Sequence, residues 1–242
     1  MIPSSPKRTL LFARLSTLAF YAPEWLVTRR LGEERQLYAV NAVYQGALAV
    51  AGFWYGPALC RMLAVNVISS GPFYQAMEET IAALRQHMTP ARLAELPVIV
   101  LAYPAPFILA VGLLPRQRQA YLTSDLIENL GVYGRRFLLA RVWLHGRWPQ
   151  RLAALLPVLA LTVILADMPS SVRDWLVLIG FLAGWLVLHW LFELHVDRQA
   201  AQAIGEGATQ GLQEMLAATA PPVAWQTVHP QIRWRLRAVA GQ

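Results

Sequence analysis

Charged side chains are scarce in this chain: Asp, Glu, Lys and Arg make up 14% of its 242 residues, whereas hydrophobic residues make up 56%. A soluble domain normally carries about 25% charged residues, so this composition favours an integral membrane protein. The 21 basic residues exceed the 14 acidic ones, which gives a net charge of +7. Because the basic residues cluster beside apolar runs and no aromatic-basic binding module is recognisable, we expect them to meet the lipid bilayer and not nucleic acid.

Cysteine is also nearly absent. The single Cys60 excludes an internal disulfide framework. The N-terminus, MIPSSPKRTLLFARL, has basic residues ahead of an apolar stretch, yet Arg14 interrupts that stretch and no small-residue cleavage site follows. We therefore expect the N-terminal segment to be retained and not to be a cleaved signal peptide.

Three charge-free windows are candidate membrane segments: residues 36–60, 152–166 and 175–192. The first and the last contain pairs of glycines four residues apart, a spacing typical of packed membrane helices. These pairs are Gly52 with Gly56 and Gly180 with Gly184. Because the polar turn DMPSSVRD joins the second window to the third, we expect residues 151–192 to form a transmembrane helical hairpin with both ends on one side.

A fourth apolar window, residues 96–115, has the hydropathy of a membrane helix but not the residues of one. Pro104 and Pro106 stand in its middle, where proline removes a backbone donor and disrupts helix geometry. The flanking runs are rich in β-branched and aromatic residues, as strands are. We therefore expect a small β-sheet here and not a broken transmembrane helix. The expected strands are 97–103, 107–114 and 118–124.

The rest of the chain predicts helices by apolar residues at three-to-four spacing and by capping residues. We expect the last membrane segment to continue as one helix through residues 193–205, and we expect a basic tail at 229–239. The other expected helices are 71–88, 123–130, 132–146 and 211–220.

Two motifs follow one another in the second half of the chain. Glu193-Leu-His-Val-Asp197 follows the expected hairpin, and His229-Pro230 comes later, with Arg235 six residues after the histidine. This order resembles the HtpX-type membrane zinc metallopeptidases, which show an H-E-x-x-H helix, a membrane hairpin, an E-x-x-A-D segment and a C-terminal H-P-x-x-x-x-R. Within the resemblance, YLTSDLIENL corresponds to the helix before the zinc helix and LLARVWLH to the zinc helix itself. The resemblance covers about residues 73–239.

The resemblance implies a mainly α-helical integral membrane protein: a metallopeptidase-like helical domain with a small β-sheet and an inserted transmembrane hairpin. It divides the chain into four parts. These are an N-terminal membrane region at 1–70, the first part of the peptidase-like domain at 71–150, the transmembrane hairpin at 151–192 and the remainder of the domain at 193–242.

The chain departs from this family at the positions that would bind zinc and activate water. The family motif falls on RVWLH, which keeps the second histidine as His145 but puts Arg141 at the first ligand position and Val142 at the general base. With Glu193 at the third position, two of three protein ligands remain, and catalytic zinc normally has three. A general base typically contributes about 10²–10⁴-fold in rate, and valine cannot replace it. We therefore expect no cofactor and no hydrolysis.

The same comparison predicts what replaces the metal. If the family geometry persists, Glu193 is buried without zinc and needs another cation. Arginine stays charged and can bond a carboxylate through two parallel donors. We therefore expect Arg141 to fill the metal's place and pair with Glu193, with His145 packed alongside.

Simpler interpretations of these residues are kept open. His145 could be a histidine at an interfacial helix end, and Glu193 with Asp197 a solvated helix end after a membrane span. His229 could belong to a loop, and Arg235 could meet anionic lipid headgroups. An active enzyme would need zinc held by a rearranged site from His145, His189 or His195 with Glu193.

The sequence thus predicts a catalytically inactive, peptidase-like protein that binds or scaffolds a membrane-protein or peptide partner. A divergent active zinc metallopeptidase and an unrelated polytopic membrane scaffold are the alternatives. Five arginines make the segment before the hairpin strongly basic, so the positive-inside rule places the folded domain in the cytoplasm, beneath a bacterial-type inner membrane. They are Arg135, Arg136, Arg141, Arg147 and Arg151. The N-terminus is also basic, and both basic regions can be cytoplasmic only if residues 9–27 also cross the membrane or if the first window re-enters it.

Overall fold

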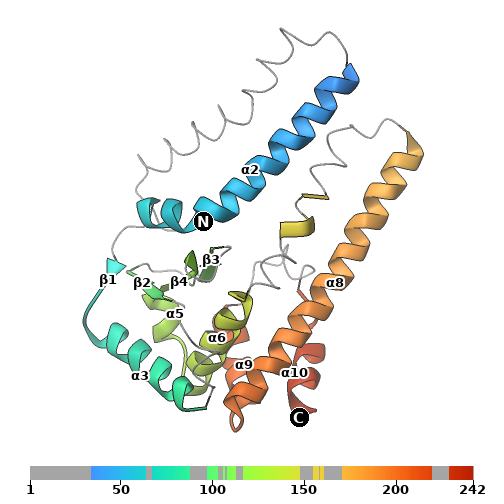
Figure 1. Ribbon diagram of the computed structural model, residues 1–242. Helices are drawn as coiled ribbons and strands as arrows, with labels where there is room; N and C mark the ends of the chain where they lie inside the picture. Colours follow the sequence, from blue (N-terminus) through green and yellow to red (C-terminus); the bar gives the residue numbers. More distant parts are fainter. Residues whose placement is uncertain are drawn as a thin grey trace.

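In a computed structural model of the chain, the described residues are 34–63, 67–87, 97–102, 106, 108–112, 117–147, 155–157, 159–160, 171–219 and 229–241. They are mostly helical and include one small mixed sheet, as predicted. In chain order the main elements are α2 (Glu34–Leu63), β1 (Val67–Ile68), α3 (Pro72–His87), β2 (Val98–Leu101), β3 (Ile108–Val111), β4 (Gln119–Thr123), α5 (Ser124–Glu128), α6 (Val132–His145), α8 (Val172–Ile204), α9 (Ala208–Ala218) and α10 (Ile232–Ala240). Figure 1 shows α2 and α8 as two long helices that extend beyond the sheet and the shorter helices.

The predicted sheet is present between residues 97 and 123. Its strand order is β1-β2-β4-β3, with β2 and β4 parallel and the other two pairings antiparallel. The fully buried β4 lies between β2 and β3, where neighbouring strands cover both of its edges. The two-residue strand β1 was not predicted, since a strand so short leaves no periodic signal.

The core forms where α6 packs between α8 and α9. At the α6–α9 contact the backbones approach closely: a Cβ at Gly211 would stand 2.5 Å from the carbonyl oxygen of Tyr133. Glu214 of α9 reaches the first turn of α6, where its Oε2 accepts a hydrogen bond of 2.8 Å from the Gly134 N–H. A carboxylate at a helix N-terminus also interacts favourably with the helix dipole. This contact fixes the helix that carries the candidate site.

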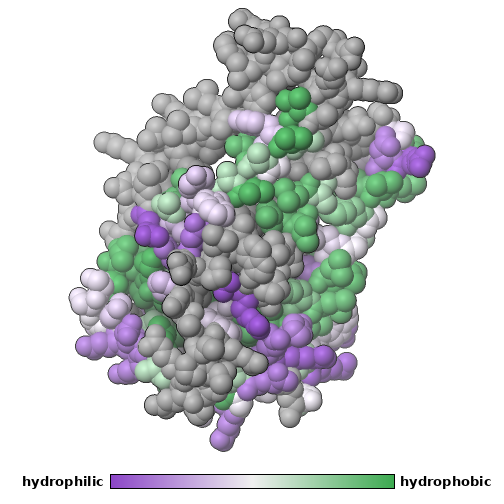
Figure 2. All heavy atoms as spheres, in the orientation of Figure 1, coloured by the Kyte–Doolittle hydropathy of each residue, from purple (hydrophilic) through white to green (hydrophobic). Residues whose placement is uncertain are grey.

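Helix α8 is continuous over 33 residues, about 50 Å, as the sequence predicted. It begins with a capping box in which Ser171 and Asp174 satisfy each other's backbone N–H groups. Among the described residues it is the one helix long and apolar enough to cross a membrane, and 6% of its most apolar stretch is buried. Apolar surface follows much of this helix in Figure 2, whereas hydrophilic surface gathers toward the lower end of the molecule. Exposed apolar surface of this extent is consistent with membrane association.

The other membrane predictions have less support. The window at 36–60 is helical within α2, but the apolar stretch recognised there is shorter, Ala42–Gly52. Of the first arm of the expected hairpin, only residues 155–157 and 159–160 are described, and they are helical. The expected crossing at 9–27 lies outside the described residues. Several spans and the hairpin therefore remain predictions.

Candidate functional site: an arginine–carboxylate cluster at the end of a groove

Arg141 of α6 is held by two carboxylates of α8. Its Nη2 donates to Oε2 of Glu193, and its Nε donates to Oδ1 of Asp197 at 2.9 Å. Residues four apart lie one turn above each other on one helix face, so the two carboxylates face the same guanidinium. Both are buried, with 3% of Glu193 and none of Asp197 exposed. The predicted pair of Arg141 with Glu193 is confirmed, and Asp197 is a second partner that the sequence did not reveal.

Arg235 of α10 completes the cluster. Its Nε donates to Asp197 Oδ2 at 2.6 Å and its Nη2 donates to Oδ1 at 2.9 Å, the parallel arrangement that gives arginine–carboxylate pairs their strength. Arg235 is 4% exposed. The buried Arg235 and the part-buried Arg141, whose side chain is 16% exposed, thus meet two buried carboxylates, and the cluster is balanced in charge. This contact rules out the simpler interpretations in which Arg235 meets lipid headgroups and the two carboxylates form a solvated helix end.

His145 lies beside the cluster at the C-terminal end of α6, as predicted. Its Nε2 is 3.4 Å from Glu193 Oε1, and its ring makes an edge contact with Phe192 at 5.6 Å between centroids. Val142, at the position of the family's general base, is 4% exposed. A valine side chain can neither accept a proton nor bind a metal, so at this position it contributes packing alone.

The electrostatics leave Arg141 charged and His229 neutral at neutral pH. Burial lowers the pKa of Arg141 to about 10; Asp197 acts in the opposite direction, and Arg235 lowers the pKa further. Arg141 is therefore still a cation at pH 7, which is why it needs both carboxylates. Burial is also the main cause that lowers the pKa of His229 to about 4, with Arg141, Arg235 and His189 adding to it. His229 is thus a neutral imidazole under the same conditions.

In the described part of the chain, no group of three or more His, Cys, Asp or Glu side chains could hold a metal ion. Of the histidines considered for a rearranged site, His195 is exposed. His189 instead stacks on Trp185 and lies 6.0 Å, between ring centroids, from His229. The guanidinium of Arg141 is the cation that Glu193 contacts.

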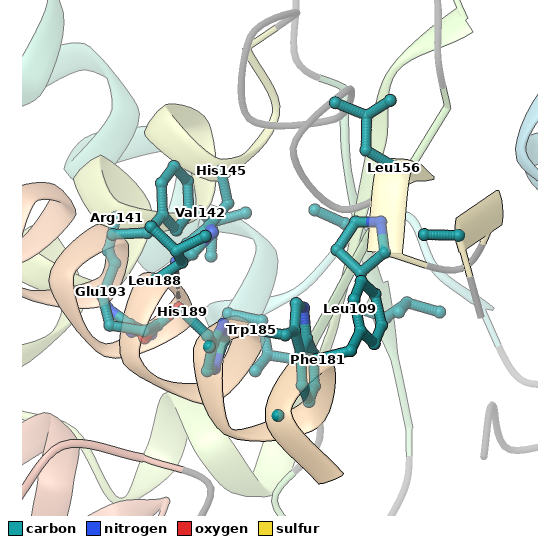
Figure 3. Close-up of a pocket in the computed structure, with 17 residues that line it drawn as sticks. Leu109, Arg141, Val142, His145, Leu156, Phe181, Trp185, Leu188, His189 and Glu193 are labelled. Carbon is teal, nitrogen blue, oxygen red and sulfur yellow. Dashed lines mark hydrogen bonds and ion pairs between the residues drawn. The ribbon is translucent and has the colours of Figure 1, made fainter. Parts of the chain in front are cut away.

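A groove of about 980 Å³ begins at this cluster and follows α8. Figure 3 shows Arg141, His145 and Glu193 at one end, and Leu109 and Phe181 toward the other. Its walls come from α6, α8, strand β3 and the residues Leu156, Pro157 and Ala160, and they are mostly apolar or aromatic. A volume near the upper end of the usual range for ligand pockets, about 300–1,000 Å³, is enough for a sizeable apolar group.

The glycine pair of α8, whose spacing is typical of packed helices, lines the groove. Gly180 and Gly184 line the groove, and among the described residues no atom would lie within 4 Å of a Cβ at either position. They therefore widen the groove and do not let a described helix approach α8. Spacing alone could not distinguish these roles, because a missing side chain suits both a close helix contact and an open wall.

No family model, no curated protein and no solved structure matches this chain. The resemblance to HtpX-type metallopeptidases therefore stays a prediction that rests on the order of the motifs.

Proposed function

We propose that this protein is a membrane-embedded, peptidase-like binding protein that holds an apolar peptide segment of a partner in the groove beside α8 and does not cleave it. The observation that carries the proposal is the position of Arg141. Its guanidinium lies where His145 and Glu193 approach each other, which is the place of a metal ion in the family that the sequence resembles. An arginine clasped by two carboxylates has no lone pair for zinc and leaves Glu193 no free charge.

The groove supports binding of a peptide in an extended conformation. Ile108, Leu109 and Ala110 of β3 form part of its wall. Strand β3 is at the end of the strand order, and among the described residues β4 is its one strand partner. The unpaired edge of such a strand can add a further strand through backbone hydrogen bonds, while side chains enter neighbouring pockets. The apolar lining then favours a hydrophobic segment over a polar one.

The exposed apolar side chains of α8 support placing this groove in a membrane. The proposed location is a bacterial-type inner membrane, with the shorter helices on the cytoplasmic side, because the segment around α6 is rich in arginine. Bound peptide would then be a segment of a membrane protein that lies within the bilayer, near its cytoplasmic surface. This chain would act by holding or presenting that partner protein.

Metal analysis and cleavage assays test the loss of hydrolysis. The purified full-length chain is expected to contain no stoichiometric zinc and to leave casein and unfolded membrane proteins intact. Stoichiometric zinc, with a chelator-sensitive proteolysis that is lost on Glu193→Ala, would show instead that a divergent enzyme is present.

Site-specific photo-crosslinking in membranes tests the binding role. A photo-reactive residue at Leu188, which lines the groove, is expected to capture a peptide or protein partner. The matched control is Leu191, which is 59% exposed on the same helix but is not part of the groove lining. Equal capture at both positions would mean that partners meet the outer surface of α8 and not the groove.

A further inference from the structure

We propose that the first turn of α10 docks on the headgroup layer of an anionic membrane, through Ile232, Arg233 and Trp234, and thereby fixes the helix whose next residue, Arg235, clamps the buried cluster. The inference rests on the proposed function in one respect, the placement of α8 across the bilayer.

The first turn of α10 exposes apolar and basic side chains together. Ile232 is 59% exposed and Trp234 is 37% exposed, although both are large hydrophobic residues. Arg233 is exposed between them, and Arg237 is exposed one turn later. Helix α10 contains no acidic residue. Apolar residues combined with arginine are typical of segments that lie in the membrane interface and attract anionic lipids.

The position of this turn along α8 matches the expected depth of a membrane surface. Trp234 makes an edge contact with Trp190 of α8, at 5.8 Å between ring centroids. The exposed large apolar residues of α8 end at Leu191, and the exposed residues that follow include His195 and Arg198. Tryptophan is enriched where an apolar span meets the headgroups. The Trp190–Trp234 contact therefore lies at the transition from the apolar to the polar part of α8.

The rest of α10 points away from that surface and into the protein. Arg235 is buried on Asp197, and Val239 belongs to the hydrophobic core. In Figure 1 α10 lies alongside the lower part of α8, with the C-terminus at the lower end of the molecule. Lipid contact at the first turn and core contact at the later residues would hold Arg235 from both sides. The membrane surface would thus help to order the cluster that closes the end of the groove.

Charge complementarity selects an anionic lipid surface as the occupant. Arg233 donates from Nε to the neutral side chain of Gln231 at 2.6 Å, so its charge is not neutralised by that contact. An arginine near an anionic membrane contributes about 1 kcal/mol, which corresponds to about a fivefold change in surface partitioning.

Spin-label accessibility in nanodiscs tests the docking. The full chain, with Cys60→Ala, carries a nitroxide in turn at Ile232→Cys, at Leu182→Cys of the apolar part of α8, and at Gln213→Cys on the exposed side of α9. In phosphatidylcholine with phosphatidylglycerol, we expect labels 182 and 232 to collide more with oxygen than with a neutral nickel chelate, and label 213 to show the reverse. If label 232 behaves like 213 while 182 reports lipid, the docking is wrong and the membrane placement stands. If label 182 also collides more with the nickel chelate than with oxygen, both the docking of α10 and the membrane placement of α8 are wrong.

A comparison of lipid mixtures with and without phosphatidylglycerol tests whether the docking requires anionic lipid. Removing phosphatidylglycerol is expected to raise nickel access at label 232, and Arg233→Gln is expected to reduce this lipid dependence several-fold. The matched control is Arg198→Gln, because Arg198 is an exposed arginine about 12 Å further along α8 from Trp190. Equal depth in both lipid mixtures, or an equal effect of the two variants, would overturn the role of anionic headgroups.

Discussion

Arg141 and Arg235 donate to the same carboxylate oxygen, Oδ1 of Asp197, each across an N–O distance of 2.9 Å. The two arginines come from α6 and α10, and the aspartate comes from α8, so one buried oxygen joins three helices. Two guanidinium groups so close together repel each other unless a negative charge lies between them. Asp197 therefore stabilises the cluster by more than either ion pair alone.

Replacing the shared acceptor is expected to destabilise the protein most strongly. Asp197→Asn leaves Arg141 and the buried Arg235 with Glu193 as the remaining acidic partner in the cluster, and losing one partner of a buried pair typically costs about 3–5 kcal/mol. Thermal unfolding in detergent measures the loss, and hydrogen exchange of the α10 amides reports whether that helix detaches. As a control, Glu128→Gln on the exposed end of α5 should change stability by less than about 0.5 kcal/mol. Similar losses for the two variants would contradict a structural role of Asp197.

The pair of Arg141 with Glu193 is expected to show coupling in a double-mutant cycle. Arg141→Met leaves two buried carboxylates one turn apart, whereas Glu193→Gln leaves Arg141 with Asp197. The arginine variant should therefore be the less stable of the two, and the double variant should lose less than the sum of the singles. The measurement is again thermal stability in detergent, with Arg198→Met as the control on the same scale. Additive losses would mean that the contact contributes little.

The sequence allowed the arginine–glutamate pair to be predicted because two local patterns combined. RVWLH placed Arg141 and His145 one helical turn apart, and the family motif order suggested that Glu193 returns to the same point. The sharing of Asp197 could not be predicted, because it depends on how α10 packs against α8. That packing brings residues 38 positions apart into contact, and no local propensity encodes it.

The sheet and the groove also combine features that the local sequence predicts with features that depend on tertiary contacts. Pro104 and Pro106 within an apolar run were enough to favour strands over a membrane helix, since proline acts locally. The parallel pairing of β2 with β4 and the place of β3 beside α8 required tertiary contacts that the residue pattern does not specify. Similarly, Glu214 gave no signal as the partner of the Gly134 N–H, because a glutamate within a helix is most often a solvated residue.

Alanine substitutions at Gly211 of α9 and at Gly180 of α8 are expected to have opposite effects on stability. A Cβ at Gly211 would meet the Tyr133 carbonyl at 2.5 Å and the Phe137 Cβ at 3.0 Å, so Gly211→Ala is expected to cost about 1–3 kcal/mol through overpacking. Among the described residues no atom would lie within 4 Å of a Cβ at Gly180, so Gly180→Ala should be neutral or stabilise α8 by up to about 1 kcal/mol. Chemical or thermal unfolding of both variants gives the comparison. A tolerated alanine at 211 would show that the two helices are not as close as described.

Stability is expected to fall as the pH is lowered from about 6.5 to about 4, and His229 is expected to cause part of that fall. Burial, then Arg141, Arg235 and His189 lower its pKa from 6.5 to about 4, while Asp197 opposes them. Between these two values the unfolded chain binds a proton at His229 and the folded chain does not, so protons favour unfolding. The contribution of a neutral His229 is therefore fully present above about pH 6.5 and is lost as the pH falls toward 4.

Unfolding temperatures measured against pH in detergent test this contribution. His229→Asn removes the titration and should flatten the slope between pH 6.5 and 4, although it can lower stability at every pH. Its matched control is His195→Asn, which removes an exposed histidine from α8 and should leave the slope as in the wild type. An unchanged slope in His229→Asn would mean that acid acts elsewhere, for instance on the carboxylates of the cluster. A flattened slope would show that protonation of His229, near Arg141 and Arg235, contributes to the loss of stability in acid.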